Sequence, residues 1–337
     1  MSNARKLADN LPTEGQLSGR NMVINGAMNV AQRSTSSTGL GASAGYFTCD
    51  RWRMGVVTSG RLTMSQSSDS PDEFGNSLKL ECTTADTSIA AGEYMLIQHL
   101  IEGQDLQRIA KGTSSAKKIT VSFYVKGNGN ATYMCELYDN DNARHATHQF
   151  SVTSSWTRVI LTFNSDTTGA FDDDNSLSLY LTLWLHSGSS YSGGSYTAST
   201  WASNVNSNRA VGASSFFSST SNTFQITGVQ MEVGSQASPF EHEPVGVTLS
   251  KCQRYYWQTV GSGPHYYATQ YSAGYRFIQV DFGQEMRATP TVTVSYASGA
   301  SLTNYLINRQ HWKAYLAANY DATASYRSDS LKLDAEL

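Results

Sequence analysis

The stretch Leu177-Ser178-Leu179-Tyr180-Leu181-Thr182-Leu183-Trp184-Leu185 decides the fold class. Every second residue is leucine, so an extended chain gathers the leucines on one face and the other residues on the opposite face. A helix would distribute the same leucines around its whole circumference. The stretch therefore predicts a β-strand that turns one apolar face toward a core.

The same period of two recurs along most of the chain. It covers residues 118–126, 156–163, 276–282 and 291–296. Residues 224–233 predict a further strand, in which Gly228 is a candidate β-bulge. Many strands separated by turn residues predict an all-β protein built as a β-sandwich.

Turns and helices are marked more locally. The run Gly127-Asn128-Gly129-Asn130 favours a turn, because glycine adopts positive φ at little cost. It predicts a hairpin in which residues 131–138 return beside the preceding strand. Only residues 101–109 and 247–256 carry a helical pattern, and both predict short helices.

The length of the chain and the position of two prolines predict more than one domain. A chain of 337 residues corresponds to about two domains, and two closely spaced prolines, Pro239 and Pro244, precede a new β-rich region. Residues 1–20 are polar and cannot bury much by themselves, so they predict an arm that orders against a partner. We expect this arm, a sandwich domain over residues 21–243 and a smaller β-rich C-terminal domain over residues 244–337.

Composition excludes several classes of protein. Charged residues are only 15% and the net charge is −3, so the basic footprint of a nucleic-acid binder is absent. No apolar run approaches the roughly 18 residues of a spanning helix, and the N-terminus lacks the apolar segment of a signal peptide, so we expect no membrane insertion. The four cysteines form no CxxC pair, and Cys135 lies in an apolar run, which favours buried free thiols over the alternative of disulfides. We expect a protein made in a reducing cytoplasm.

Several short motifs, in a fixed order, resemble one family. The opening residues 21–28 (NMVINGAM), then Ala31-Gln32-Arg33 and Cys49-Asp50-Arg51-Trp52, are similar to the start of many bacteriophage tail-fibre and related virion proteins. Later parts of the resemblance are residues 226–234 (ITGVQMEVG), 237–241, 251–256 (KCQRYY) and 286–292 (MRATPTV). Cys49 stands where alanine is usual, and residues 302–337 match nothing in the family.

The resemblance implies a fold and a role. It implies a jelly-roll domain like a carbohydrate-binding module, a homotrimer, and a place on a phage particle after synthesis in the bacterial host cytoplasm. The arm of residues 1–20 would dock on other tail or head proteins of the virion. The protein would then attach the particle to a glycan or a protein of the host surface.

Aromatic side chains are the candidate contacts with such a receptor. Trp and Tyr rings can stack on sugar rings while neighbouring polar groups bind the hydroxyls. Tyr180 and Trp184 share the strand face opposite the leucines, which would be a platform if exposed and a packing surface otherwise. The remaining candidates lie on polar loops or in the C-terminal domain, where binding and packing between subunits both stay open: Tyr191, Tyr196, Trp201, Tyr305, Trp312 and Tyr315.

Metal signals are limited to acidic turns. Two aspartate-rich runs could supply oxygen ligands to a structural Ca²⁺ ion, or could simply be solvated turns. Their residues are Asp139, Asp141, Asp172, Asp173 and Asp174. His145 and His148 form a two-ligand fragment with no partner cluster, and no other cofactor is indicated.

Catalysis finds little support in the sequence. Gly41-Ala42-Ser43-Ala44-Gly45 matches the G-x-S-x-G pattern, but it lies in a Ser/Gly/Thr run and not between a strand and a helix. We therefore expect no catalytic residue and a non-enzymatic tail fibre or receptor-binding protein. The alternatives are a head fibre or a tail or capsid decoration protein without a receptor role, and a glycan depolymerase.

Overall fold

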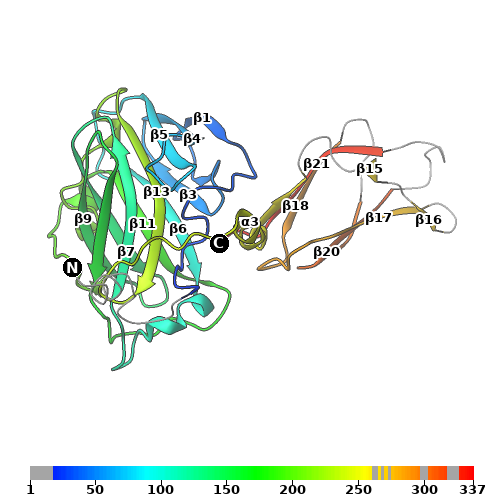
Figure 1. Cartoon of the computed structure of the whole chain (residues 1–337). Coiled ribbons are helices and arrows are strands. Elements are labelled where there is room, and N and C mark those ends of the chain that lie inside the picture. The colour runs from blue at the N-terminus through cyan, green and yellow to red at the C-terminus, as the bar shows by residue number, and fades with distance from the viewer. Residues whose placement is uncertain (1–17, 260–264, 267–268, 272–274, 297–302, 317–325) are drawn as a thin grey trace. The chain divides into compact units, whose positions relative to one another are not determined.

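The computed structural model describes residues 18–259, 265–266, 269–271, 275–296, 303–316 and 326–337. The chain divides into two compact units, Met1–Glu243 and Pro244–Leu337 (Figure 1). Both are built from antiparallel strands, so the chain is all-β as the alternating patterns predict. In the described part of the chain, no helix is both long enough and apolar enough to span a bilayer.

The first unit is a jelly-roll β-sandwich of two antiparallel sheets. One sheet has the order β1 (Ser36–Leu40), β4 (Arg61–Ser67), β5 (Ser77–Thr84), β13 (Thr223–Val233), β7 (Ile119–Gly127), β10 (Thr157–Phe163). The other has the order β12 (Ala202–Ser203), β9 (Arg144–Val152), β8 (Ala131–Asp139), β11 (Leu177–Ser187), β6 (Tyr94–Glu102), β3 (Trp52–Val57), β2 (Gly45–Tyr46). Short helical turns lie in the connections: η1 (Gly103–Asp105), η2 (Gln107–Ile109), α2 (Ser189–Ser192), η3 (Asn206–Asn208) and η4 (Phe216–Ser218).

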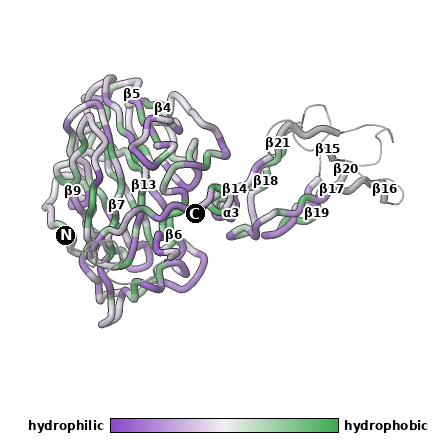
Figure 2. The backbone as a smooth tube through the Cα atoms, viewed as in Figure 1, coloured by the Kyte–Doolittle hydropathy of each residue, from purple (hydrophilic) through white to green (hydrophobic). Residues whose placement is uncertain are grey.

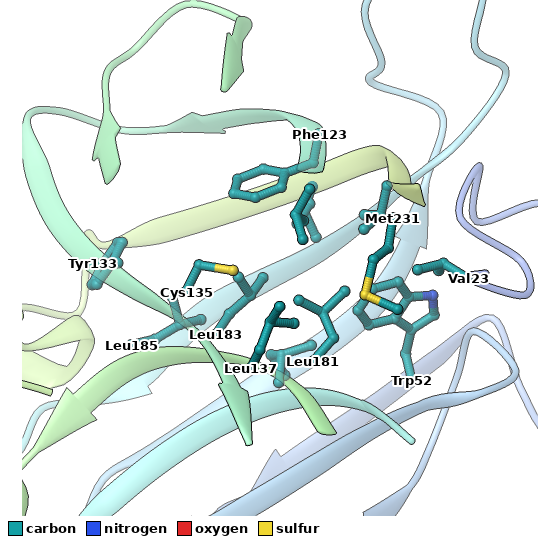
Figure 3. Close-up of a cluster of buried hydrophobic side chains, with 14 of the residues drawn as sticks. Val23, Trp52, Phe123, Tyr133, Cys135, Leu137, Leu181, Leu183, Leu185 and Met231 are labelled. Carbon is teal, nitrogen blue, oxygen red and sulfur yellow. The ribbon is translucent and has the colours of Figure 1, made fainter. Parts of the chain in front are cut away.

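The core of this unit lies between the two sheets. Leu179, Leu181, Leu183 and Leu185 of β11 are all buried, which confirms the predicted inward face. In Figure 3, leucines of β11 face Phe123 and Met231, which come from the opposite sheet. Hydrophobic and hydrophilic stretches are accordingly intermingled along the strands of the tube in Figure 2. A strict period of two thus places one apolar row per strand in a shared interior.

Two local predictions have clear outcomes. Gly228 has a φ of 61°, and the register between β13 and β7 shifts beside it, so the predicted bulge is confirmed. The helix predicted over residues 101–109 is wrong, because β6 continues to Glu102 and only the 3₁₀ turns η1 and η2 follow. Pairing with β11 keeps Ile101 extended opposite Leu179, and this tertiary contact overrides the local helical pattern.

The opening motif forms a local hydrogen-bond network around Asn25. The Asn25 amide donates to the carbonyl oxygens of Val30 at 2.9 Å and Asp50 at 3.0 Å, and it accepts from the Val30 N–H at 3.0 Å. The Trp52 indole donates to the Asn25 carbonyl at 3.2 Å. A Cβ on Gly26 would lie 2.1 Å from the Val229 carbonyl oxygen, so only glycine fits there. The motif that carries the family resemblance therefore builds the sandwich.

Of the N-terminal arm, only residues 18–20 are described. The Gly19 N–H donates to the Glu241 carboxylate at 2.6 Å, and the Arg20 guanidinium donates to the Pro239 carbonyl at 2.8 Å. These contacts tie the start of the sandwich to its last segment. Residues 1–17 lie outside the described residues, so docking through residues 1–20 stays a prediction.

The second unit contains two small sheets. Its elements are α3 (Val245–Gln253), β14 (Tyr256–Gln258), β15 (His265–Tyr266), β16 (Thr269–Tyr271), β17 (Tyr275–Asp281), β18 (Thr291–Tyr296), β19 (Thr303–Ile307), β20 (His311–Leu316) and β21 (Tyr326–Asp334). One sheet has the order β14-β21-β15, with β18 also paired to β21, and the other has the order β16-β17-β20-β19. Met286, Trp312, Leu331 and Leu333 are buried in its core. The helix predicted over residues 247–256 is present, but it begins and ends earlier in the chain.

All four cysteines are buried free thiols, as the sequence predicts. Burial, together with the charge of Asp50, raises the pKa of the Cys49 thiol to about 12. These side chains pack as small apolar groups and are not poised to act as nucleophiles.

Candidate functional site

A groove of about 330 Å³ lies on the outward face of the seven-stranded sheet. It crosses β3, β6, β11 and β8, and the connection after β11 closes one side of it. Its lining consists of Arg53, Gly55, Tyr94, Leu96, Gln98, Tyr138, Asn140, Tyr180, Trp184, Tyr191 and Arg209.

Strand register places these side chains on one face. Because the leucines of β11 point inward, Tyr180, Thr182 and Trp184 point outward. Tyr180 lies directly opposite Tyr138 of β8, and Thr182 lies opposite Gln98 of β6. Neighbouring strands therefore bring aromatic and amide groups together from distant parts of the sequence.

The aromatic rings form two groups in the groove. Tyr138 and Tyr180 meet edge to face with ring centroids 5.8 Å apart, and both remain partly exposed. Tyr94 and Tyr191 meet in the same way at 5.5 Å. Trp184 is only 1% exposed, because the Tyr191 ring packs against it with the two ring centroids 5.2 Å apart. The tyrosines are therefore the exposed aromatic surface, and Trp184 supports them from below.

Arg209 covers the middle of the groove floor. Its guanidinium carbon lies 4.7 Å from the centre of the Tyr138 ring and 5.0 Å from that of Trp184. The same guanidinium donates two hydrogen bonds to the Glu136 carboxylate, at 2.7 and 2.9 Å. Glu136 also accepts from the Trp184 indole at 2.8 Å and is fully buried. This planar, bidentate contact fixes Arg209 against the rings.

The buried carboxylate remains ionised because of these partners. Burial alone would raise the pKa of Glu136, but the charge of Arg209 and the hydrogen bonds from His145, Arg209 and Trp184 together hold this pKa below its usual range. The pKa of Arg209 is raised, since the attraction of Glu136 outweighs the burial that opposes it. Glu136 thus stabilises the groove floor by binding Arg209 and Trp184.

Polar groups complete the lining. The Arg53 guanidinium donates to the Gln98 side-chain oxygen at 2.7 Å, and the Gln98 amide lies 3.3 Å from the Thr182 hydroxyl. Asn140 is exposed at the end of β8. The groove therefore combines flat apolar ring surfaces with amide and guanidinium donors, as expected for a site that binds a small polar ligand.

The structure unites part of the predicted aromatic set. Tyr180, Trp184 and Tyr191 all line the groove, although the packing alternative also holds for Trp184. Tyr196 and Trp201 lie outside the lining. The Tyr196 hydroxyl accepts from the Gln149 N–H at 3.1 Å, and the Trp201 indole, 8% exposed, donates to the Asn164 carbonyl at 2.9 Å.

Other lining residues were missed by the sequence reasoning. They are Arg53, Gly55, Tyr94, Leu96, Gln98, Tyr138, Asn140 and Arg209. Tyr138 ends a predicted strand, but its position opposite Tyr180 depends on a strand pairing that no local pattern marks. Arg209 lies in a long polar loop, and nothing in that loop indicates that it folds over the sheet.

In the second unit, Trp312 is a core residue and not a surface contact. Its side chain is fully buried, and its indole donates to the Asn304 side-chain oxygen at 2.8 Å. The prediction of receptor contact through Trp312 is therefore wrong for this chain. Tyr305 and Tyr315 lie on β19 and β20, but their side chains fall outside the described ones.

The aspartates proposed as Ca²⁺ ligands have other partners. Asp139 is fully buried and accepts from the Lys111 ammonium, which also lies 3.2 Å from Asp166. This ammonium supplies the positive charge that a cation would supply. Asp141 accepts from the Asp172 N–H at 3.0 Å, and the remaining candidates, Asp172, Asp173 and Asp174, are exposed. Within the described residues, no grouping of three metal-type ligands includes any of the five.

Comparisons with known proteins give weak structural similarities. No family model and no curated protein matches the sequence. A CBM4 structure is 11% identical with a TM-score of 0.33 and covers 63% of this chain and 99% of its own. A family 11 carbohydrate-binding module from Clostridium thermocellum, in complex with a β-1,3-1,4-mixed-linked tetrasaccharide, is 14% identical with a TM-score of 0.29 and covers 62% and 99%. The enzymatically active domain of tailspike protein 4 of bacteriophage CBA120 is 12% identical with a TM-score of 0.32, and it covers 63% of this chain and 21% of its own.

Proposed function

We propose that the chain binds a glycan in the groove of its sandwich unit. The observation that carries this proposal is the pair of partly exposed tyrosines, Tyr138 and Tyr180, flanked by Gln98, Arg53 and Asn140. Tyrosine rings stack on the apolar faces of sugar rings, and amide and guanidinium groups bind the hydroxyls around them. A volume of about 330 Å³ is at the lower end of the range for small-ligand sites, which suits a short saccharide.

The groove is built for binding and not for cleavage. A glycosidase needs two carboxyl groups across the scissile bond, one of them free to donate a proton. Glu136, the carboxylate beneath the groove, is fully buried and is held by Arg209, His145 and Trp184. It supports the tyrosine surface and is screened from a ligand by the Arg209 side chain.

We further propose that the protein is a receptor-binding component of a phage particle. The motif resemblance at residues 21–52 and 226–241 supports this assignment. A homotrimer docked through residues 1–20 would present several grooves at once. Weak individual contacts with a host glycan would then be multiplied by effective concentration.

Glycan binding is tested with the full chain on an array of bacterial surface glycans, followed by calorimetric titration of each hit. Tyr180→Ala removes one stacking surface and should weaken binding about two- to tenfold, since an aromatic contact contributes roughly 0.5–1.5 kcal/mol. Trp156→Ala is the matched control, because Trp156 is a partly exposed aromatic outside the groove. Equal affinity of the Tyr180→Ala variant and the unaltered chain would refute the groove assignment.

Separate measurements address the other parts of the proposal. Release of reducing ends from a bound polysaccharide would show a depolymerase and overturn the binding-only assignment. Antibody labelling of particles under the electron microscope distinguishes a tail position from a head position. The mass of the purified protein in solution tests the homotrimer.

A further inference from the structure

Three potential metal ligands meet at the end of β11, away from the aspartates singled out by sequence. His186 lies on β11, Glu93 immediately precedes β6, and Asp86 lies in the connection before it. Their ligand atoms all lie within 4.8 Å of one another. Residues separated by about a hundred positions in the sequence are therefore brought together by the β6–β11 pairing.

His186 is oriented as a metal ligand would be. Its side chain is fully buried, and its Nδ1 lies 2.8 Å from the Ser215 hydroxyl. Its Nε2 has no hydrogen-bond partner and lies 3.8 Å from the Glu93 carboxylate. A buried nitrogen without a partner is costly. With Nδ1–H donating to Ser215, Nε2 carries a lone pair aimed at the two carboxylates, and a hydrogen bond at the second nitrogen is what metal-binding histidines usually have.

The two carboxylates are held in place by neutral donors. Asp86 is 5% exposed and accepts from the Thr58 hydroxyl at 2.8 Å and from the Ser59 N–H at 3.0 Å. Glu93 accepts from the Ala90 N–H at 2.9 Å. These donors orient the carboxylates without cancelling their charge, and each carboxylate keeps lone pairs for a cation.

We propose that Asp86, Glu93 and His186 bind a divalent transition-metal ion of the Zn²⁺ class. An imidazole nitrogen with two carboxylate oxygens suits Zn²⁺, with water as the fourth ligand, whereas Ca²⁺ takes oxygen ligands only. Ligand atoms around tetrahedral Zn²⁺ lie roughly 3.3 Å apart, so the three ligand atoms, which lie within 4.8 Å of one another, would move closer together by at most about 1.5 Å. The ion would join the β5–β6 connection to the end of β11.

The same segments carry part of the groove wall. Tyr94 follows Glu93 directly, and the Gly188 N–H donates to the Glu93 carbonyl at 2.8 Å, one turn before Tyr191. A bound ion would fix this wall. Metal binding itself does not rest on the proposed glycan binding, and it is measured without any saccharide.

The test is calorimetric titration of the chelator-treated full chain with ZnCl₂. We expect a single Zn²⁺ site per chain, and no competition by CaCl₂. Glu93→Gln keeps an oxygen for the Ala90 N–H, and Asp86→Asn keeps the shape of the side chain. Each should weaken Zn²⁺ binding by at least about tenfold, the lower bound for loss of even an outer-shell partner.

His311→Gln is the matched control. His311 also faces a carboxylate, with 2.7 Å between its Nδ1 and Asp281, but it is partly exposed and has no place in the three-ligand group. Its loss should leave Zn²⁺ affinity unchanged, while Zn²⁺ should raise the Tm of the unaltered chain and not of Glu93→Gln. Near-ultraviolet circular dichroism without metal confirms that each variant is folded. Absence of Zn²⁺ binding, undiminished binding by both carboxylate variants, or equal binding of Ca²⁺ would overturn the proposal.

Discussion

Replacing Arg209 by methionine is the perturbation that most directly examines the groove floor. Arg209 donates two hydrogen bonds to Glu136, which is fully buried, and its guanidinium lies over Tyr138 and Trp184. Methionine keeps most of the apolar stem against these rings but removes the charge. The variant therefore isolates the effect of leaving a buried carboxylate without its cation.

The expected loss follows from the burial of the pair. Removing one partner of a buried ion pair costs about 3–5 kcal/mol. The Arg209 side chain is 16% exposed, and His145 and Trp184 still donate to Glu136, so the lower end of this range applies. We therefore expect the free energy of unfolding to fall by about 3 kcal/mol near neutral pH.

The pH dependence has a definite sign. In the unaltered chain the pKa of Glu136 is lowered, so its contribution to stability is present above the unfolded-state pKa of about 4.3 and is lost as pH falls through the folded-state value. In Arg209→Met, burial acts without the opposing charge and raises this pKa above the unfolded value. That variant loses stability as pH rises through the folded-state pKa, so its deficit should shrink between about pH 8 and about pH 5.

Urea unfolding of the full chain, followed by near-ultraviolet circular dichroism, measures both effects. Arg61→Met is the control, because Arg61 donates only to the backbone carbonyls of its own turn, and we expect a loss below about 1 kcal/mol. A loss below about 1 kcal/mol for Arg209→Met at pH near 8, or a deficit that does not shrink on acidification, would refute the reasoning.

Four further variants or conditions examine other parts of the fold. Gly26→Ala places a Cβ 2.1 Å from a backbone carbonyl oxygen of β13, and urea unfolding should show a loss of about 1–3 kcal/mol; an unchanged midpoint would contradict this tight contact. Lys111→Met leaves two buried carboxylates without their ammonium and should cost about 3–5 kcal/mol in the same assay, so a neutral effect would disprove the role of this ion pair. Trp312→Ala should cost about 3–5 kcal/mol in thermal unfolding and lower the transition of the second unit, whereas a surface residue would leave that transition unchanged. Burial, with the charge of Arg51, holds the pKa of His99 well below its usual range. The free energy of unfolding should therefore be highest above the unfolded-state pKa of about 6.5 and should fall by up to about 1.4 kcal/mol per pH unit below it. A free energy of unfolding that does not change with pH over this interval would count against a neutral, buried His99.

The fold class could be predicted from the sequence because the alternation of apolar and polar residues along a half-buried strand is visible in the sequence alone. The alternating leucines of residues 177–185 indicate one apolar face without any knowledge of its partners. This face is buried from Leu179 to Leu185 and half-buried at Leu177. Gly228 was likewise readable, since glycine inside a strand pattern marks a bulge. The helix prediction for residues 101–109 is wrong because the start of this segment belongs to β6, whose conformation depends on its pairing with β11 and not on local sequence.

The burial of Trp312 could not be predicted from the sequence, because it depends on packing partners that the sequence does not identify. The sequence leaves both receptor contact and packing between subunits open for Trp312. In the structure Trp312 and Ala314 form the buried row of β20, and the alternating residues His311 and Lys313 are less buried. The period of two was present, but a row of two residues is too short to fix which face is buried. Packing against Met286 and Leu333 decides the matter.

The residues that carry the family resemblance and the residues that line the groove are different sets. Asn25, Gly26 and Trp52 hold the opening segment against the sandwich, and none of them lines the groove. Tyr180 and Arg209 do line it, and both lie outside every motif that resembles the family. Sequence motifs of this kind therefore report on the scaffold. The groove lining is built from side chains that strand register and a long loop bring together, so the proposed ligand has to be identified by experiments on the groove itself.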